Sequence, residues 1–338
     1  MAARAEAMLP PDQRPTAVQW VRKNLLDGWW NSILTVAAAF FLVRFGVALG
    51  GWAVRASWDI VTNNPRFWLV GLMPVEFARR AFWAGGLIAA AAVLTYLGVR
   101  ARVQPRVFAG LWAGILISVA VIMSPIRLDQ IGGLYLTILL AVVGIAASFP
   151  IGVLVGIGRV SQLPVVRWFS TAYIELIRGI PFIAVLLWFS VFVTLVSGDA
   201  LSRVQRAMIA ITVFTSAYVA EIMRAGIQSV SRGQTEAARA VGLSGWQTMR
   251  FIVLPQAFKN MIPSLVGQFI SLFKDTSLTV IIGLSELVGT GRALLARTEY
   301  LHDVPQTYGF LLVVYFIGSF AMSAASRRIE KRMGLGER

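Results

Sequence analysis

Long apolar stretches constrain the fold of this chain more than any other feature. A helix that spans a bilayer needs about 20 consecutive, mostly apolar residues. Such stretches lie near residues 32–54, 82–99, 107–123, 132–157, 180–197, 207–223, 264–283 and 308–326. Only 14% of the residues are charged, whereas soluble domains carry roughly 25%, and no polar region is left for a soluble catalytic domain. The sequence therefore predicts an all-α integral membrane protein with about eight transmembrane helices.

The positive charge of the chain is distributed unevenly among the predicted loops. A net charge of +15 would suit a nucleic-acid-binding protein, but Lys and Arg concentrate on alternate loops, as they do on the cytoplasmic side of membrane proteins. With the N-terminus inside, cytoplasmic segments hold 20 of the 31 basic residues, and segments on the opposite side hold 9. The distribution predicts that both termini are cytoplasmic. It favours membrane lipid over nucleic acid as the surrounding partner.

The organisation of the chain changes near residue 130. The three earlier spans carry no recognisable motif, whereas Gly144 with Ser148 and Gly152 with Gly156 place small residues four apart in a later span. This spacing lets helix backbones approach closely in lipid. We expect a cytoplasmic tail at 1–31, an N-terminal extension with three transmembrane helices at 32–130, a core with five transmembrane helices at 131–326, a cytoplasmic loop at 224–263 within that core, and a cytoplasmic tail at 327–338.

The cytoplasmic loop contains signals for two short helices in the stretch "TEAARAVGLSGWQTMRFIVLPQ". Thr235 is predicted to cap the first helix, and Gly242 is typical of the left-handed position that ends one. Ser244 and Gln247 have the spacing of a capping box, so a second helix should begin there. This helix should end before Pro255, because a proline disfavours helical geometry in the residue before it.

The second short helix carries an apolar stripe formed by Trp246, Met249 and Val253, spaced three and four residues apart. Helices this short are marginal in water by themselves, so the stripe requires a cover. Two interpretations remain open from the residues alone. The loop packs against its own helical bundle, or it docks into another protein.

The same loop resembles the EAA loop of ABC-importer permeases. The resemblance rests on Glu236, Ala237, Ala238, Gly242, Ile252, Leu254 and Pro255. It implies that the loop binds in a groove of a cytoplasmic ABC ATPase dimer. The chain contains no Gly-x4-Gly-Lys-[Ser/Thr] motif, the pattern that cradles nucleotide phosphates. We therefore expect a transport subunit that is not an enzyme and holds no cofactor, with ATP and Mg bound by the partner ATPase.

Three further stretches resemble the polar amino-acid uptake family of ABC permeases, the histidine, glutamate, glutamine and arginine type. They are "YIELIRGIPF" (173–182), "AYVAEIMRAGIQSV" (217–230) and "SLFKDTSL" (271–278). The long N-terminal extension resembles the permeases of glutamate/glutamine or general L-amino acid transporters. The resemblance implies a multi-pass protein of the bacterial inner membrane, a periplasmic amino-acid-binding protein, and a second, related permease subunit. It leaves open which amino acids are carried.

Charged residues within the predicted spans are candidates for the translocation path. Lys274 and Asp275 lie near the centre of the span at 264–283, where each costs roughly 2.5–3.5 kcal/mol to insert. Their helix should therefore face the bundle interior or a watery cavity, with Glu221 and Arg178 as expected partners from other spans. The candidate path residues are Lys274, Asp275, Thr276, Ser277, Glu221 and Arg178. The alternative for this set is an internal ion pair that fixes helix packing.

Two other classes of protein are compatible with parts of the pattern. In an ion-coupled secondary transporter, Lys274, Asp275 and Glu221 would bind protons or ions. In a non-transporting scaffold, the loop at 224–263 would only recruit a partner. We expect no catalytic residues and no metal site, because carboxylates are not clustered and the single histidine, His302, lies in a predicted outer loop.

Overall fold

The part of the chain that the structure describes is mostly helical. This computed structural model describes residues 16–100 and 104–334, so the ends of both predicted tails and part of the 100–106 loop lie outside the described residues. Within them, seven helices are long and apolar enough to cross a membrane, and a bent pair of shorter helices brings the number up to eight. The prediction of an all-α membrane protein is confirmed. The chain divides into two compact units, Met1–Ser57 and Trp58–Arg338.

The first unit contains two helices in its described part. Helix α1 (Ala17–Leu25) begins after Thr16, whose side chain accepts from the amide of Gln19 while the Gln19 side chain accepts from the amide of Thr16. Helix α2 (Trp29–Arg55) is one of the candidate membrane spans, and none of its residues is buried. An apolar helix that is exposed all round is suited to lipid rather than to a protein core.

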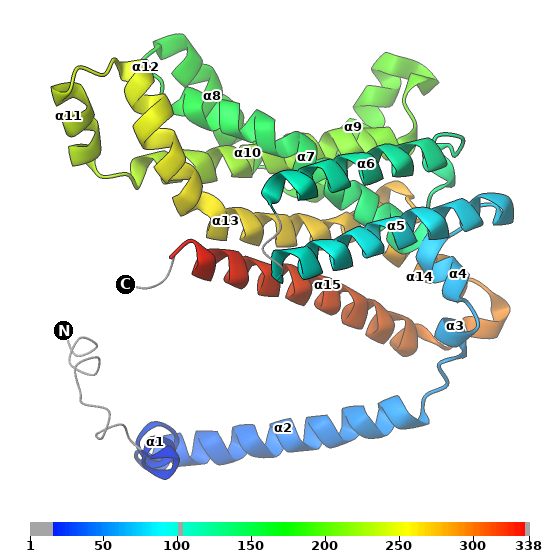
Figure 1. Ribbon diagram of the computed structural model, residues 1–338. Helices are drawn as coiled ribbons and strands as arrows, with labels where there is room; N and C mark the ends of the chain where they lie inside the picture. Colours follow the sequence, from blue (N-terminus) through cyan, green and yellow to red (C-terminus); the bar gives the residue numbers. More distant parts are fainter. Residues whose placement is uncertain (1–15, 101–103, 335–338) are drawn as a thin grey trace. The chain divides into compact units, whose positions relative to one another are not determined.

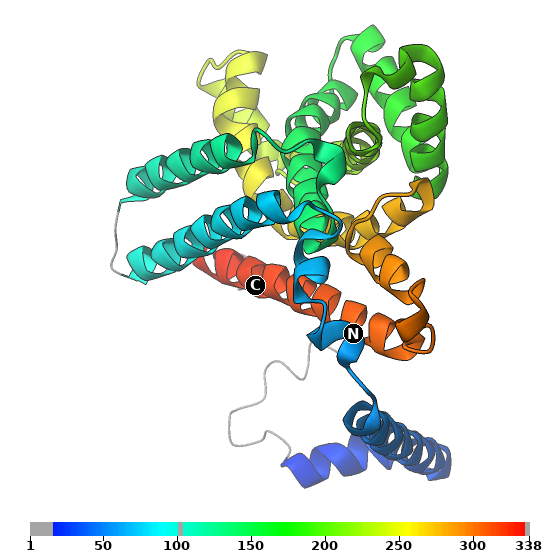
Figure 2. The same ribbon diagram turned by 90° about the vertical axis from the view of Figure 1, so that its right-hand side faces the viewer.

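The second unit opens with two short helices and a helical hairpin. Helices α3 (Asp59–Thr62) and α4 (Pro65–Val70) precede α5 (Val75–Arg100) and α6 (Pro105–Met123). Both views show α5 and α6 as neighbouring antiparallel helices (Figures 1 and 2). The remaining long elements are α7 (Gly133–Arg159), α8 (Pro164–Arg178), α9 (Phe182–Ser197), α10 (Arg203–Gln228), α13 (Leu254–Asp275), α14 (Leu287–Leu295) and α15 (Val304–Arg332).

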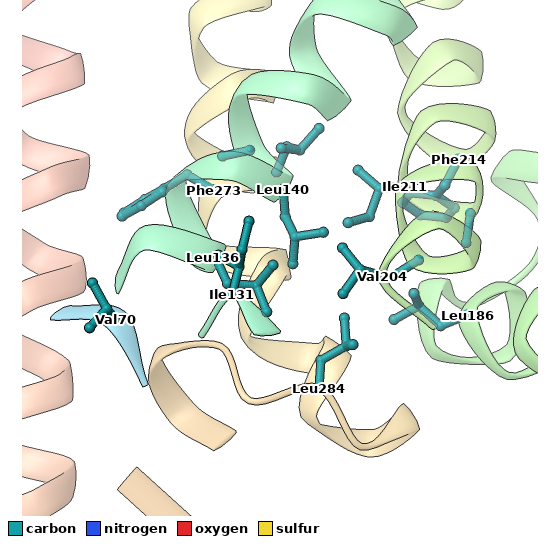
Figure 3. Packing of buried hydrophobic residues seen from close by; sticks show 14 of the residues in the cluster. Val70, Ile131, Leu136, Leu140, Leu186, Val204, Ile211, Phe214, Phe273 and Leu284 are labelled. Carbon is teal, nitrogen blue, oxygen red and sulfur yellow. The ribbon is translucent and has the colours of Figure 1, made fainter. Parts of the chain in front are cut away.

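Helices α7 and α10 form the centre of the second unit. Leu136 and Leu140 of α7 are buried against Ile211 of α10, and Figure 3 shows these side chains converging. A Cβ atom added at Gly152 would lie 2.5 Å from the Cβ of Val219, and one at Gly144 would lie 2.6 Å from the Cγ2 of Ile211. Neither position has room for a side chain. The close approach predicted from the small residues four apart is therefore confirmed.

The loop before the α5–α6 hairpin packs against the C-terminal part of the core. Trp68 of α4 is 3% exposed and clusters with Leu287 and Leu294 of α14 and with Leu311 of α15. The indole N–H of Trp68 donates to the carbonyl of Ile60 at 3.1 Å. Part of the predicted N-terminal extension thus contributes to the core of the second unit.

Candidate coupling loop and translocation path

The helix–turn–helix arrangement of the cytoplasmic loop is present, with one boundary displaced. Helix α11 spans Arg232–Ala240 and begins after Ser231, so Thr235 lies inside the helix and the prediction that it caps the helix is wrong. Gly242 has φ +84° and lies directly beyond the end of the helix. The amide of Leu243 donates to the carbonyl of Ala238 at 3.0 Å, which completes the end of the helix. The sharp turn at Gly242 is confirmed.

The second helix begins where predicted but does not end there. Ser244 and Gln247 form the expected capping box before α12 (Gly245–Thr248). A π-helical turn, η6 (Met249–Val253), then connects α12 to α13, so the chain stays helical through Pro255 and the predicted end is wrong. In this wider turn the amide of Leu254 donates to the carbonyl of Met249, five residues back. The wide turn can admit a proline ring that would clash in a regular helix.

The expected apolar stripe is divided between the bundle and the solvent. Val253 is 6% exposed and packs in a buried cluster with Met261 and Leu265 of α13. Trp246 is instead 66% exposed. The interpretation that the loop folds back against its own bundle therefore describes only the C-terminal end of this stripe. An exposed indole on a rigid polar loop is typical of a protein interface.

The EAA residues have different surroundings. Ala238 is 4% exposed in α11, which packs against α12 and η6, whereas Glu236 and Ala237 are exposed. The Gln256 amide group donates to the Gln234 side chain at 3.3 Å, which connects α11 to the start of α13. Ile252 and Leu254 are half-buried, and Pro255 is exposed. The loop is thus anchored on its inner side and accessible on its outer side.

Glu221 of α10 is the centre of an ion cluster at the ends of α7 and α8. Its carboxylate lies 2.8 Å from a terminal nitrogen of Arg159, 2.5 Å from one of Arg224 and 3.8 Å from one of Arg178. Arg159 also lies 2.5 Å from the carboxylate of Glu175. The structure therefore brings Glu221 and Arg178 together, as candidate residues of different helices, within a five-residue cluster.

Lys274 and Asp275 lie apart from this ion cluster. The Lys274 side chain is exposed and Asp275 is half-buried, and in the described part of the chain neither forms an ion pair with Glu221 or Arg178. The expectation that Glu221 and Arg178 are their partners is wrong. The reason is geometric, because Glu221 lies beside Arg159 and Arg224, whose guanidinium groups occupy its oxygens.

The helix changes form directly after these two charged residues. Helix α13 ends at Asp275 and continues as the 3-10 helix η7 (Thr276–Ile282) inside one candidate span, Gly245–Ile282. The hydroxyl of Thr276 donates to the carbonyl of Phe273, and that of Ser277 donates to the carbonyl of Lys274, each at 2.7 Å. A 3-10 segment within a longer helix often marks a functional hinge. The candidate path residues thus lie at an irregular point of the span.

Glu286 is a buried charged residue that the sequence analysis missed. It is 0% exposed and caps α14, accepting from the amide of Val288 at 2.7 Å and from the amide of Gly289 at 3.0 Å. The Tyr315 hydroxyl lies 3.4 Å from the same carboxyl. Burial raises the pKa of Glu286 from 4.5 to about 7, against the smaller lowering by these hydrogen bonds. The sequence did contain a signal for this role, because Glu286 lies between two spans and directly before an apolar helix, where a carboxylate can act as an N-cap.

The sequence of this chain is similar to a known protein family and to characterised members of it. Residues 148–335 match the family described as binding-protein-dependent transport system inner membrane component. The inner membrane amino-acid ABC transporter permease protein YhdY of Escherichia coli (strain K12) is 35% identical, over 95% of this chain and 94% of the relative. The glutamate/glutamine/aspartate/asparagine transport system permease protein BztC of Rhodobacter capsulatus is 32% identical, over 90% of this chain and 67% of the relative.

A solved structure agrees with these sequence relatives. A crystal structure described as an amino acid ABC transporter with histidines is 30% identical, with a TM-score of 0.55, and the match covers 59% of this chain and 92% of that one. The structural match covers a helical transporter fold. The family match covers residues 148–335, which include the EAA loop and the irregular span. The chain is therefore a multi-pass inner-membrane protein, and it belongs to the family of binding-protein-dependent transport system inner membrane components.

Proposed function

We propose that this chain is the membrane-spanning permease subunit of an ABC importer that carries polar L-amino acids across the inner membrane. The family consists of transport components, and the relatives described above are named as permeases of amino-acid transporters. The permease itself performs no bond chemistry in this proposal. It provides the path, while a separate ATPase subunit binds ATP and Mg and supplies the free energy.

The observation that carries this proposal is the exposed and preformed coupling unit, residues 232–253. Gly242 fixes the angle between its helices, Val253 anchors it to the bundle, and Trp246 remains 66% exposed. Such a unit suits a groove on another protein, because its shape is set before the partner arrives. ATP-driven closure of an ATPase dimer would then move the unit together with α13, to which η6 joins it without a break.

The remaining partners follow from the same proposal. A periplasmic amino-acid-binding protein would deliver substrate at the end of the bundle opposite to the coupling unit. A second, related permease subunit would complete the path, because the Lys274 side chain is exposed on a membrane-spanning segment and needs a polar neighbour there. The asymmetry of basic residues supports the placement of both termini in the cytoplasm.

The two rival interpretations differ in what they require. In an ion-coupled transporter, Lys274, Asp275 and Glu221 would bind protons or ions, whereas Glu221 is engaged by Arg159 and Arg224. The relatives described above are named as ABC transporter components and give this rival no support. A scaffold that only recruits a partner would need the exposed loop at 224–263. It would not need the irregular polar span that contains Lys274 and η7.

The experiment compares Gly242→Val with Gly245→Val in the assembled complex. A Cβ atom added at either glycine would meet nothing within 4 Å, but only Gly242 has a positive φ, so a β-branched residue strains the turn at 242 and not at 245. We expect Gly242→Val to abolish substrate-stimulated ATP hydrolysis and uptake while the complex still assembles, and Gly245→Val to keep at least about half of both. Equal effects of the two substitutions would contradict a coupling role for the turn.

A further inference from the structure

A basic pocket lies at the end of the bundle opposite to the coupling unit. It has a volume of about 580 Å³ and is lined by the start of α10, the segment after η7, and the 3-10 helix η4 (Leu128–Gln130) with its flanks. Helix α10 has 26 residues, which places Arg203 roughly 35–40 Å from the coupling unit at 1.5 Å per residue. The pocket thus belongs to the predicted outer side. The volume is of the size that small-molecule sites have.

The charges around this pocket are unbalanced. Arg127, Arg203 and Arg206 line it, and among the side chains that the structure describes Asp129 is the acidic member of the lining. Asp129 lies 3.0 Å from a terminal nitrogen of Arg127. In the described residues no acidic group lies within 4.0 Å of Arg203 or Arg206. Two guanidinium groups one helical turn apart on one wall of the pocket therefore have no counter-charge among the described side chains.

The protein holds one of the two unbalanced arginines by a hydrogen bond and encloses part of the other. A terminal nitrogen of Arg203 donates to the carbonyl of Gly283 at 3.2 Å. The Nε atom of Arg206 is buried and has no hydrogen-bond partner in the described part of the chain. Because its Nε is enclosed, Arg206 can be met only at its terminal nitrogens, from inside the pocket. A guanidinium group suits a planar anion, since it presents parallel donors that match the two oxygens of a carboxylate.

We propose that this pocket is a subsite for the α-carboxylate of an amino acid, with Arg206 and Arg203 as the carboxylate-binding residues. Asp129, whose side chain is 44% exposed, offers an acceptor for the α-ammonium group at the rim. The site would bind the zwitterionic part that all amino acids share, and so it would not select among side chains. This inference rests on the proposed function, because it names the part of the substrate that the outer side of the importer binds.

A carboxylate on a docking protein is the other anion that could reach this wall. The enclosure of Arg206 favours the small ligand, because a protein surface would first meet Arg127, whose side chain is 77% exposed at the rim. The two possibilities predict that replacing the arginines weakens different binding steps. A substrate subsite affects the binding of free amino acid to the complex, whereas a docking surface affects the binding of the amino-acid-binding protein.

The test measures binding of radiolabelled L-glutamine to the purified permease–ATPase complex, without binding protein and without ATP. The α-carboxamide of glutamine serves as the competitor that lacks the carboxylate. Arg206→Gln is compared with Arg206→Lys, with Arg203→Gln and with the control Arg292→Gln, which removes an exposed arginine of α14 outside the pocket. Assembly and basal ATP hydrolysis report whether each variant is folded, and Arg203→Gln tests the site if Arg206→Gln fails to assemble.

We expect the Kd for L-glutamine to rise at least about 10-fold in Arg206→Gln and Arg203→Gln, less in Arg206→Lys, and not in Arg292→Gln. The α-carboxamide should compete only weakly with labelled L-glutamine, and equally weakly in the unaltered complex and in the variants. Unchanged Kd values would overturn the subsite, as would weaker docking of the binding protein with unchanged glutamine binding. Failure of the proposed function is a separate result, in which the unaltered complex with binding protein and ATP takes up no amino acid.

Discussion

The glycines of α7 are the residues on which helix packing depends most directly. We predict that Gly152→Leu prevents a stable fold, because a Cβ atom at this position already lies 2.5 Å from the Cβ of Val219 and 2.7 Å from the carbonyl oxygen of Ser216. Gly152→Ala should destabilise by about 1–3 kcal/mol through overpacking. Thermal unfolding of the purified complex measures both. The control Gly267→Leu adds the same side chain where nothing lies within 4 Å and should change stability little.

Glu286 makes the stability of the protein depend on pH. The folded state raises its pKa from 4.5 to about 7, so between these values the folded protein holds a proton that the unfolded chain releases. The contribution of this carboxyl to stability is therefore highest below pH 4.5 and falls as the pH rises through 7. Between about pH 5.5 and 8 the loss should be about 2 kcal/mol.

The substitution Glu286→Gln isolates this effect, because the amide keeps an acceptor for the cap of α14 but does not titrate. Unfolding in urea at about pH 5.5 and at about pH 8 should show a smaller difference for Glu286→Gln than for the unaltered protein. If the free energy of unfolding changed equally between the two pH values in both proteins, Glu286 would be ionised throughout this range.

The ion cluster around Glu221 connects three helices, and its central carboxylate should matter most. Glu221→Gln removes the negative charge and one of the two oxygens that Arg159, Arg178 and Arg224 share, and the three guanidinium groups would repel one another. We expect a loss on the order of 2 kcal/mol, because the side chains of Glu221 and Arg159 are only 22% and 19% exposed. The matched control is Glu175→Gln, since Glu175 is 59% exposed and should contribute less than about 1 kcal/mol. A larger effect from Glu175 would contradict this ranking.

The coupling loop shows which parts of an element can be predicted from sequence. The capping box at Ser244 and the turn at Gly242 depend on neighbouring residues only, and both are present as predicted. The continuation of the helix through Pro255 depends on the π-helical turn before it, which local rules do not include. The partners of Glu221 were missed for a similar reason. They come largely from the ends of other helices, and hydropathy gives spans but not the rotation of one helix against another.

The basic pocket illustrates the same limit for the candidate sites. Arg203 and Arg206 were counted only as loop charges in the sequence, because the contact of Arg203 with Gly283 requires the packed fold. By contrast, Lys274 and Asp275 could be recognised as candidates from the cost of charge within an apolar stretch, whereas the change to the 3-10 helix η7 after Asp275 was not predicted. The number and positions of the spans were also predictable, apart from the bent pair α8 and α9, whose axes differ by 103°.

At the scale of the whole molecule, the short helices α3 and α4 before α5 are part of the core of the second unit and not a dispensable addition. We predict that Trp68→Ala lowers the free energy of unfolding by about 3–5 kcal/mol, because it empties a site between α14 and α15. Trp83→Ala is the matched control, since Trp83 is 69% exposed and faces away from the core. Thermal unfolding of the assembled complex measures both variants. A larger loss from Trp83 would show that the core does not depend on Trp68.

The central claim is that this chain carries amino acids for an ATP-driven importer. The most direct measurement is the uptake of a labelled L-amino-acid panel into proteoliposomes that contain the chain with its partner permease and ATPase. The binding protein is supplied on the side opposite to the ATPase. We expect uptake that requires ATP on the ATPase side, persists when ion gradients are collapsed, and is lost in Gly242→Val. Uptake that continues without ATP and stops when an ion gradient is removed would contradict it.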